Sequence, residues 1–283
     1  MDIKKPFVAG AGIMGSGIGQ LCAQQGYGVA VIDVSQELVK KAEEKVKAGL
    51  QKRVEAGKIA QDEMNSVLSR IKWSVDLNLA RDSDLVIEAI SENIEAKKEL
   101  FKKLDTICSP QTILATNTTA LSVSEIASAT SRPDKVIGMH FFNPAVVMKL
   151  VEIIRGEKTS EETIAATKKF AESLGKAPIA TSKEAPAGIV SRVLAGLLNE
   201  AAVVYSQGIA SAQDIDEAMK LGAGLPMGPL ALMDMIGLDI HLAKMETLYS
   251  KLRDERYKPL DVIKKMVAEG KLGKKSGQGF YKY

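Results

Sequence analysis

His140 and Glu152 are the residues of this chain best suited to acid–base chemistry. His140 ends the apolar segment 135–140, which is typical of a buried strand, and Glu152 lies twelve residues further along, in the next extended segment. Histidine exchanges a proton near neutral pH, and a neighbouring carboxylate fixes the tautomer of the imidazole and stabilises its cation. Because doubly wound sheets bind ligands at the carboxyl ends of their strands, His140 is a candidate acid/base, with a structural histidine as the alternative. No motif surrounds His241, so we interpret it as structural.

A glycine-rich segment near the N-terminus is the second candidate site. Gly10, Gly12 and Gly15 match the pattern G-x-G-x-x-G between an apolar run and a helical pattern. In this pattern the first glycine permits a tight turn, the second lets the backbone approach a pyrophosphate, and the third allows close packing of helix on strand. The start of the helix, which includes Ile13 and Met14, offers backbone N–H groups to phosphates. The segment predicts a dinucleotide site; a glycine-rich turn of another α/β protein is the alternative.

Asp33 indicates which dinucleotide is bound. It follows a second apolar run, residues 29–32, at the distance from the glycines where an acidic side chain accepts hydrogen bonds from the adenosine ribose. A carboxylate there also repels the additional phosphate of NADP, and no arginine follows within a few residues. The sequence therefore predicts NAD as the cofactor.

These candidate residues must be positioned by an alternation of strands and helices. We expect six strands, which cover residues 7–9, 29–32, 84–90, 112–116, 135–140 and 151–154. Between the second and third we expect a charged helical hairpin over residues 36–70, whose second helical run extends to Ile71. This order predicts an α/β fold of the Rossmann type, with a doubly wound, mostly parallel sheet. From residue 189 to 270 the pattern is helical, so we expect an NAD-binding domain over residues 1–185 and an all-helical domain over residues 186–283.

The composition limits the class of protein. The chain has 283 residues and a net charge of +3, from 38 basic and 35 acidic residues, which gives no reason to expect nucleic acid as a partner. Cys22 and Cys108 lie far apart without metal-ligand spacing, so we expect two core thiols, no metal site and a reducing compartment. No apolar run reaches membrane-spanning length and the N-terminus has no signal-peptide pattern, so we expect a cytoplasmic protein without membrane contact.

Several longer motifs occur in an order that resembles one enzyme family. They are Asn117-Thr118-Thr119-Ala120-Leu121, His140-Phe141-Phe142-Asn143-Pro144, Met148-Lys149-Leu150-Val151-Glu152, Pro226-Met227-Gly228-Pro229 and Lys275-Ser276-Gly277-Gln278-Gly279-Phe280-Tyr281. This set resembles the NAD-dependent L-3-hydroxyacyl-CoA dehydrogenase family, and among its members most resembles the short bacterial 3-hydroxybutyryl-CoA dehydrogenases. The resemblance implies a reversible, NAD(H)-dependent reduction of acetoacetyl-CoA to (S)-3-hydroxybutyryl-CoA, with His140 as acid/base and Glu152 as its partner.

The resemblance also implies roles for residues outside the two candidate sites. Thr119 stands where the family has a serine that contacts substrate and cofactor, and Ser191 replaces the usual asparagine of the substrate region, so the resemblance places both among the catalytic residues. Further cofactor contacts are implied for Glu92, Lys97, Asn143 and Lys275, and Asn143 also lies toward the substrate. A surface glutamate or lysine is otherwise most often a solvated charge.

A basic cluster in the expected hairpin is the candidate site for the CoA phosphates. It consists of Lys52, Arg53 and Lys58, of which Lys52 matches a CoA-contacting lysine of the family, while Ala56 stands where another basic residue is common. A solvated helix face is the alternative for such a cluster. The family resemblance further implies a homodimer formed through the helical domain, and a monomer is the alternative.

Two other functions remain open on the sequence. One is another β-hydroxyacid dehydrogenase, which would use a lysine catalyst and a different glycine-rich loop. The other is a non-catalytic, cofactor-binding relative similar to the lens crystallins of this superfamily, which only Thr119 and Ser191 favour. The acyl chain length and the physiological direction of the reaction do not follow from the sequence.

Overall fold

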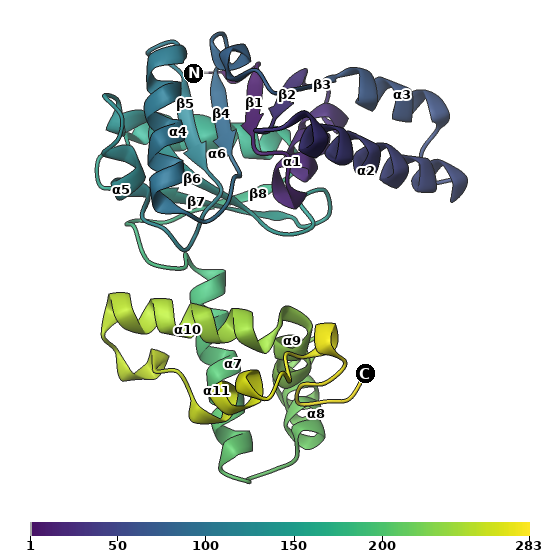
Figure 1. Ribbon diagram of the computed structural model, residues 1–283, viewed down its shortest axis with the longest axis vertical. Coiled ribbons are helices and arrows are strands. Elements are labelled where there is room, and N and C mark those ends of the chain that lie inside the picture. Colours follow the sequence, from purple (N-terminus) through teal and green to yellow (C-terminus); the bar gives the residue numbers. More distant parts are fainter. Residues whose placement is uncertain (1) are drawn as a thin grey trace. The chain divides into compact units, whose positions relative to one another are not determined.

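The protein divides into two compact units. The computed structural model describes residues 2–283, with one unit that ends at Gly188 and a second that begins at Ile189 (Figure 1). No helix among these residues is both long and apolar enough to cross a membrane.

The first unit is built on one sheet, in which eight strands pair within the described residues. The strand order is β3-β2-β1-β4-β5-β6-β7-β8, and every neighbouring pair is parallel except β6 and β7. The bounds are β1 Pro6–Ala9, β2 Val29–Ile32, β3 Ile71–Ser74, β4 Leu85–Glu88, β5 Ile113–Thr116, β6 Val136–Phe141, β7 Leu150–Arg155 and β8 Ala177–Ala180. The expected doubly wound, mostly parallel sheet is therefore confirmed.

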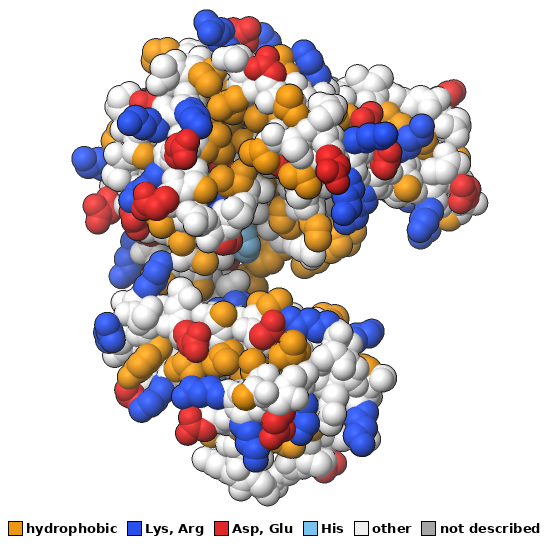
Figure 2. Space-filling model, in the orientation of Figure 1, with side chains coloured by type: hydrophobic (Ala, Val, Ile, Leu, Met, Phe, Trp, Pro, Cys, Tyr) orange, Lys and Arg blue, Asp and Glu red, His pale blue; other side chains and the backbone are white. Residues whose placement is uncertain are grey.

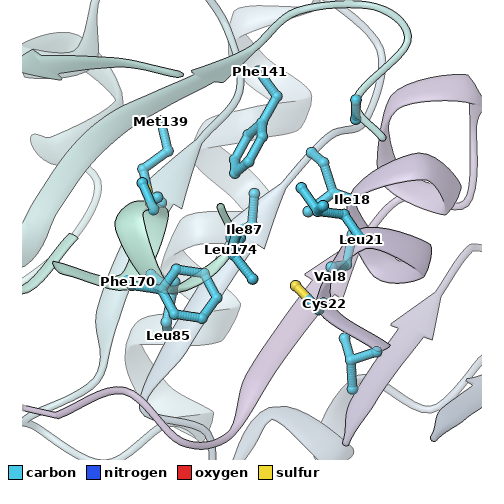
Figure 3. Packing of buried hydrophobic residues seen from close by; sticks show 14 of the residues in the cluster. Val8, Ile18, Leu21, Cys22, Leu85, Ile87, Met139, Phe141, Phe170 and Leu174 are labelled. Carbon is cyan, nitrogen blue, oxygen red and sulfur yellow. The ribbon is translucent and has the colours of Figure 1, made fainter. Parts of the chain in front are cut away.

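Both faces of this sheet are buried, which is why its central strands are continuously apolar. On one face, α1 (Ile13–Gln24) and α6 (Glu161–Ser173) pack over alternate strand residues such as Val8, Ile87 and Phe141 (Figure 3). On the other face, the strand residues between these pack with α4 (Ile94–Ile107) and α5 (Val123–Ala127).

The two cysteines are core residues, as expected. Cys22 belongs to the first hydrophobic cluster and Cys108 to the second, and neither forms a disulfide. Burial raises the pKa of Cys22 to about 12 and that of Cys108 to about 11, so both thiols stay protonated near neutral pH.

Two of the eight strands were not expected from the sequence. We predicted a helical run that included Ile71, but this residue begins β3, and β8 was missed altogether. Both lie at the edges of the sheet and bury few side chains. Ile71 is the one buried residue of β3, and β8 has no buried residue. An edge strand lacks the continuous apolar run that marks the central strands, so its sequence is not distinctive.

The expected helical hairpin is present between β2 and β3. It consists of α2 (Gln36–Glu55) and α3 (Gln61–Ser69), with Gly57 at φ +66° in the connection. Ser35 caps α2 by accepting a hydrogen bond from the N–H of Leu38. Acidic and basic side chains are mixed over the hairpin on the face shown in Figure 2.

The second unit is helical, as expected. Its helices are α7 Val190–Ser206, α8 Ala212–Ala223, α9 Pro229–Ile236, α10 Leu238–Leu252 and α11 Asp261–Ala268. Short 3₁₀ turns complete the two units: η1 Leu77–Ala80, η2 Pro133–Lys135, η3 Glu255–Tyr257 and η4 Lys274–Ser276. Leu198, Leu230, Met233 and Leu238 lie in the core of this unit.

The glycine-rich motif at the C-terminus closes the helical unit. The buried carboxylate of Asp234 accepts hydrogen bonds from the N–H groups of Phe280 and Tyr281, each at 2.9 Å. A Cβ at Gly279 would lie 2.0 Å from Oδ1 of Asp234, so only glycine permits this approach. Asp216 caps α9 through the N–H of Leu230 and also accepts the Tyr281 hydroxyl. This part of the motif is therefore structural.

His241 makes the stability of the protein depend on pH. Its ring is 1% exposed in α10, Nε2 has no hydrogen-bond partner, and burial, with a smaller contribution from Lys244, lowers its pKa to about 4. The unfolded chain binds this proton near pH 6.5, so stability is lost as pH falls from about 6.5 towards 4. In His241→Leu we expect the free energy of unfolding to fall less steeply over this range, by up to about 1.4 kcal/mol per pH unit. Urea unfolding of both proteins at several pH values measures the two slopes, and equal slopes would contradict the assignment.

Candidate active site

His140 and Glu152 form a pair across the only antiparallel junction in the described sheet. They are direct partners in the β6–β7 register, and Nδ1 of His140 lies 3.1 Å from Oε2 of Glu152. The residues next to each of them in the strand belong to the core on the sheet face that α1 and α6 cover. Because side chains alternate along a strand, both His140 and Glu152 point to the other face of the sheet. The histidine side chain is 15% exposed and the glutamate 0%, so a carboxylate shielded from water supports an accessible imidazole.

Glu152 is covered by the segment that precedes the second unit. Gly188 has φ +59°, and a Cβ on it would lie 2.5 Å from Oε2 of Glu152. The segment is held in place because the N–H of Ala187 donates to the carbonyl oxygen of Thr119 at 2.9 Å. A side chain at position 188 would displace the carboxylate, so glycine is required here for both its conformation and its size.

Asn117 supports β6 beside the histidine, a role that the sequence did not reveal. β5 ends at Thr116, so the next N–H groups of β6 have no strand opposite them. Oδ1 of Asn117 accepts the hydrogen bond from the N–H of Phe141 at 2.8 Å and so extends the ladder by one bond. The bond fixes the backbone on the C-terminal side of His140.

The glycine segment has the shape that a dinucleotide phosphate requires. Gly10 has φ +107°, and its Cβ position lies 2.5 Å from the carbonyl oxygen of Ala89; a Cβ at Gly15 would lie 1.8 Å from the carbonyl oxygen of Gly10. At Gly12 no atom outside the adjacent residues lies within 4 Å of the position a Cβ would take, and no side chain caps α1, which begins at Ile13 and continues with Met14. An uncapped helix N-terminus that faces open space fits a pyrophosphate.

Asp33 joins the glycine segment to the end of β2. Its Oδ2 accepts a hydrogen bond from the N–H of Ala11 and its Oδ1 one from the N–H of Val34, both at 2.7 Å. The carboxylate is thus oriented by two backbone groups beside the turn. This arrangement fits an adenosine ribose as the third partner, because a carboxylate accepts several hydrogen bonds at once.

Lys97 is not a solvated surface charge, which had been the alternative for it. It is 1% exposed, and its Nζ lies 2.6 Å from Oε1 of Glu88 and 3.5 Å from Oε2 of the half-exposed Glu92. Glu88, at the end of β4, also accepts hydrogen bonds from the N–H of Ile90 and the hydroxyl of Thr116, at 2.7 and 2.6 Å. The sequence did not single out Glu88, which organises the ends of β4 and β5 from inside the fold.

The other proposed site residues of the first unit lie in loops and at the hairpin. Thr119 is half-buried after β5, and Asn143 is exposed after β6. Lys52 and Arg53 end α2 and Lys58 follows it; within residues 2–283 none of these three side chains forms an ion pair. Basic residues in the last helical turn are also favoured by the helix dipole, so their position alone does not assign them to a ligand.

Ser191 and Lys275 lie in the second unit, whereas the other proposed site residues all lie in the first. Ser191 is half-buried in the first turn of α7. Nζ of Lys275 lies 2.6 Å from Oδ1 of Asp239, at the start of α10. No group of three or more potential metal ligands occurs among the described residues.

A Rossmann-type sheet with a glycine turn that fits a phosphate, a carboxylate placed to meet a ribose and a histidine–glutamate pair is the arrangement of a dinucleotide-dependent dehydrogenase. The comparison with known proteins agrees. Residues 6–185 match the model of the 3-hydroxyacyl-CoA dehydrogenase NAD binding domain, and residues 189–283 match that of the 3-hydroxyacyl-CoA dehydrogenase C-terminal domain. The chain belongs to the 3-hydroxyacyl-CoA dehydrogenase family, which confirms the resemblance and sets aside a lysine-dependent β-hydroxyacid dehydrogenase.

Individual relatives are similar over the full length of the chain. A probable 3-hydroxybutyryl-CoA dehydrogenase of Bacillus subtilis is 50% identical over 283 residues, which cover 100% of this chain and 98% of the relative. A 3-hydroxybutyryl-CoA dehydrogenase of Clostridioides difficile is 46% identical, with 98% of both chains covered. The crystal structure of (S)-3-hydroxybutyryl-CoA dehydrogenase from Ralstonia eutropha is 44% identical and superimposes with a TM-score of 0.96, covering 100% of this chain and 99% of the other.

The buried pair of Glu88 and Lys97 gives a prediction about stability. Removal of one partner leaves the other charge buried with weaker partners only, which are the half-exposed Glu92 for Lys97 and two neutral donors for Glu88. Breaking a buried ion pair in this way typically costs about 3–5 kcal/mol. We expect Glu88→Gln and Lys97→Met each to lower the free energy of unfolding by about this amount, and the double variant to lose much less than the sum. Urea unfolding of the three variants and the parent tests this; additive losses would show that the two charges do not depend on each other.

Proposed function

We propose that the protein catalyses the reversible, NAD(H)-dependent reduction of acetoacetyl-CoA to (S)-3-hydroxybutyryl-CoA. The observation that carries the proposal is the pairing of His140 with the fully buried carboxylate of Glu152 at 3.1 Å. The identity of 46–50% to 3-hydroxybutyryl-CoA dehydrogenases over nearly the whole chain supports this substrate among the acyl-CoA thioesters of the family.

His140 acts as the acid/base in this proposal. A carboxylate can only accept a hydrogen bond, so the contact of Glu152 with Nδ1 favours the tautomer that has its proton on Nδ1. Nε2 is then the atom that exchanges a proton with the substrate oxygen at C3: in its protonated form it donates to the forming alkoxide in reduction, and in its neutral form it accepts the hydroxyl proton in oxidation. The carboxylate of Glu152 keeps the ring in the orientation that presents Nε2 to the substrate in both directions of the reaction.

NAD is the cofactor that the site fits. When bound, NAD(H) would supply the hydride chemistry at C3 of the acyl chain. The open space at Gly12 and the uncapped start of α1 would hold the pyrophosphate, and Asp33 would hold the adenosine ribose. Glu92, Lys97, Asn143 and Lys275 are proposed as further cofactor contacts.

The remaining site residues are proposed to bind the acyl-CoA. Thr119, Asn143 and Ser191 are assigned to the region of the acyl group. Thr119 keeps the hydroxyl of the family's serine, and Ser191 has a hydroxyl where the family has the amide of an asparagine. Lys52, Arg53 and Lys58 lie at the connection of the hairpin, and none of them pairs with an acidic residue within the described range 2–283, which suits the phosphates of CoA. We further propose that the active form is a homodimer.

Replacement of His140 tests the mechanism. In His140→Asn we expect turnover of acetoacetyl-CoA, followed by the loss of NADH absorbance, to fall about 10²–10⁴-fold, which is the usual contribution of general acid–base catalysis. The dissociation constant for NADH should stay near that of the parent, because the imidazole moves a proton and does not bind the nucleotide. The matched control is His241→Leu, which removes the other histidine and should keep its turnover. A His140→Asn variant with full turnover would contradict the assignment.

Asp33 determines the preference for NADH over NADPH. Like charges in contact cost several kcal/mol, so we expect kcat/KM with NADH to exceed that with NADPH by about 100-fold or more. In Asp33→Asn, which keeps the shape of the side chain and removes its charge, the ratio should fall by about tenfold or more. Steady-state kinetics with both nucleotides measure the ratio, and a parent enzyme that uses the two equally well would be incompatible with this role.

A further inference from the structure

Lys176 is a buried cation that the proposed mechanism does not use. Lys176 lies just after α6, and only 8% of its surface is exposed. Its Nζ donates hydrogen bonds to the carbonyl oxygens of Ala145 and Met148, at 2.7 and 2.8 Å. Within residues 2–283 no carboxylate forms an ion pair with it. The whole charge of this lysine is therefore directed at the main chain of one segment, the β6–β7 loop, which comprises residues 142–149.

The backbone of Lys176 is rigidly placed. α6 ends at Ser173 and is closed by Gly175, which has φ +70°, and the N–H of Lys176 donates to the carbonyl oxygen of Ala171 in the last turn. On the other side, the N–H of Ala177 donates to the carbonyl oxygen of Lys149, where β7 and β8 begin to pair. Leu174, two residues before the lysine, is 1% exposed in the core drawn in Figure 3.

The β6–β7 loop is held between this lysine and the dinucleotide helix. The N–H groups of Val147 and Met148 donate to the carbonyl oxygen of Pro144 at 2.9 and 3.0 Å, which closes a tight turn. Ala145 is 4% exposed and belongs to the core, and its Cβ lies 3.3 Å from the position of a Cβ at Gly17, in α1. The loop thus contacts the helix of the glycine segment on one side and Lys176 on the other.

Burial of the Lys176 ammonium has a cost that its two hydrogen bonds must offset. The hydrogen bond to the carbonyl oxygen of Ala145 is buried, and the one to Met148 is partly buried beside the exposed side chain of Val147. The ammonium loses its own hydration on burial, which is a cost to stability. Burial is accordingly the main factor that lowers the pKa of Lys176, with a contribution from Lys149. The advantage of a buried ammonium over water is geometric, since one group of fixed position ties two carbonyl groups of the loop together.

We propose that Lys176 is a positioning residue that fixes the β6–β7 loop and thereby places Asn143 and the end of β6 for hydride transfer. The loop follows the strand of His140 directly, and Asn143 is its second residue. This inference rests on the proposed function, which gives His140 and Asn143 their roles. The adenosine end of the cofactor is held by other residues and does not depend on the lysine.

The experiment compares Lys176→Met, which keeps the length of the side chain, with Lys176→Arg and with the control Lys169→Met. Lys169 is an exposed residue of α6 that pairs with Asp2 at 2.6 Å. Three quantities are measured for each full-length protein: kcat with acetoacetyl-CoA, the dissociation constant for NADH, and amide hydrogen exchange of peptides that cover residues 142–149. The exchange measurement needs no substrate, so it tests the loop even if the parent enzyme does not turn over acetoacetyl-CoA, an outcome that would refute the proposed function only.

The proposal predicts a separation of these quantities. Lys176→Met should lower kcat about 10- to 100-fold, the usual effect of a small misplacement of reacting groups, while the NADH dissociation constant changes by less than about threefold. Exchange should increase in residues 142–149 and not in the sheet, Lys176→Arg should recover part of the kcat, and Lys169→Met should match the parent. Unchanged kcat and exchange in Lys176→Met would overturn the proposal, and so would faster exchange throughout the unit, which would indicate a structural role.

Discussion

The antiparallel pairing of β6 with β7 is the constraint on which the active site depends. In an otherwise parallel sheet, this pairing places His140 directly opposite Glu152 and puts both side chains on the same face. A shift of the register by one residue would move one of the two side chains to the opposite face and remove their contact. The distance of 3.1 Å is therefore a property of the strand register, and Gly188 covers the carboxylate of Glu152, which is fully buried while the imidazole stays accessible.

The surrounding structure holds the chain segments that meet this pair. Asn117 extends the ladder of β5 to the residue after His140, Lys176 ties the loop after β6 to the end of α6, and Glu88 connects the ends of β4 and β5 with the buried Lys97. Each of these polar groups lies at a point where regular hydrogen bonding of the sheet stops. Buried polar groups must find partners, and here the partners are the backbone and side chains of the functional loops. Rigidity at the carboxyl edge of the sheet follows from this arrangement.

The sequence predicted the central sheet, the hairpin, the helical second unit and the residue pair, because each has a local signal. Buried parallel strands are continuously apolar, the glycine segment has a fixed spacing, and His140 and Glu152 lie within recognisable motifs. β3 and β8 were missed because edge strands bury few side chains. Glu88, Gly188 and Lys176 were also missed, since each acts through a contact with a segment that is distant in sequence or through burial, neither of which a single sequence records. Gly188 alone had a local signal, as a glycine shortly before a predicted helix.

The most direct test of this account is the tautomer of His140, measured by ¹⁵N NMR of the histidine rings. The chain has only two histidines, so the spectrum of His241→Leu shows the ring of His140 alone. If Glu152 orients the ring as the structure indicates, the neutral imidazole has its proton on Nδ1, and this preference weakens in Glu152→Gln. A neutral ring protonated on Nε2, or a spectrum that Glu152→Gln leaves unchanged, would contradict the central claim that the β6–β7 register prepares His140 for acid–base catalysis.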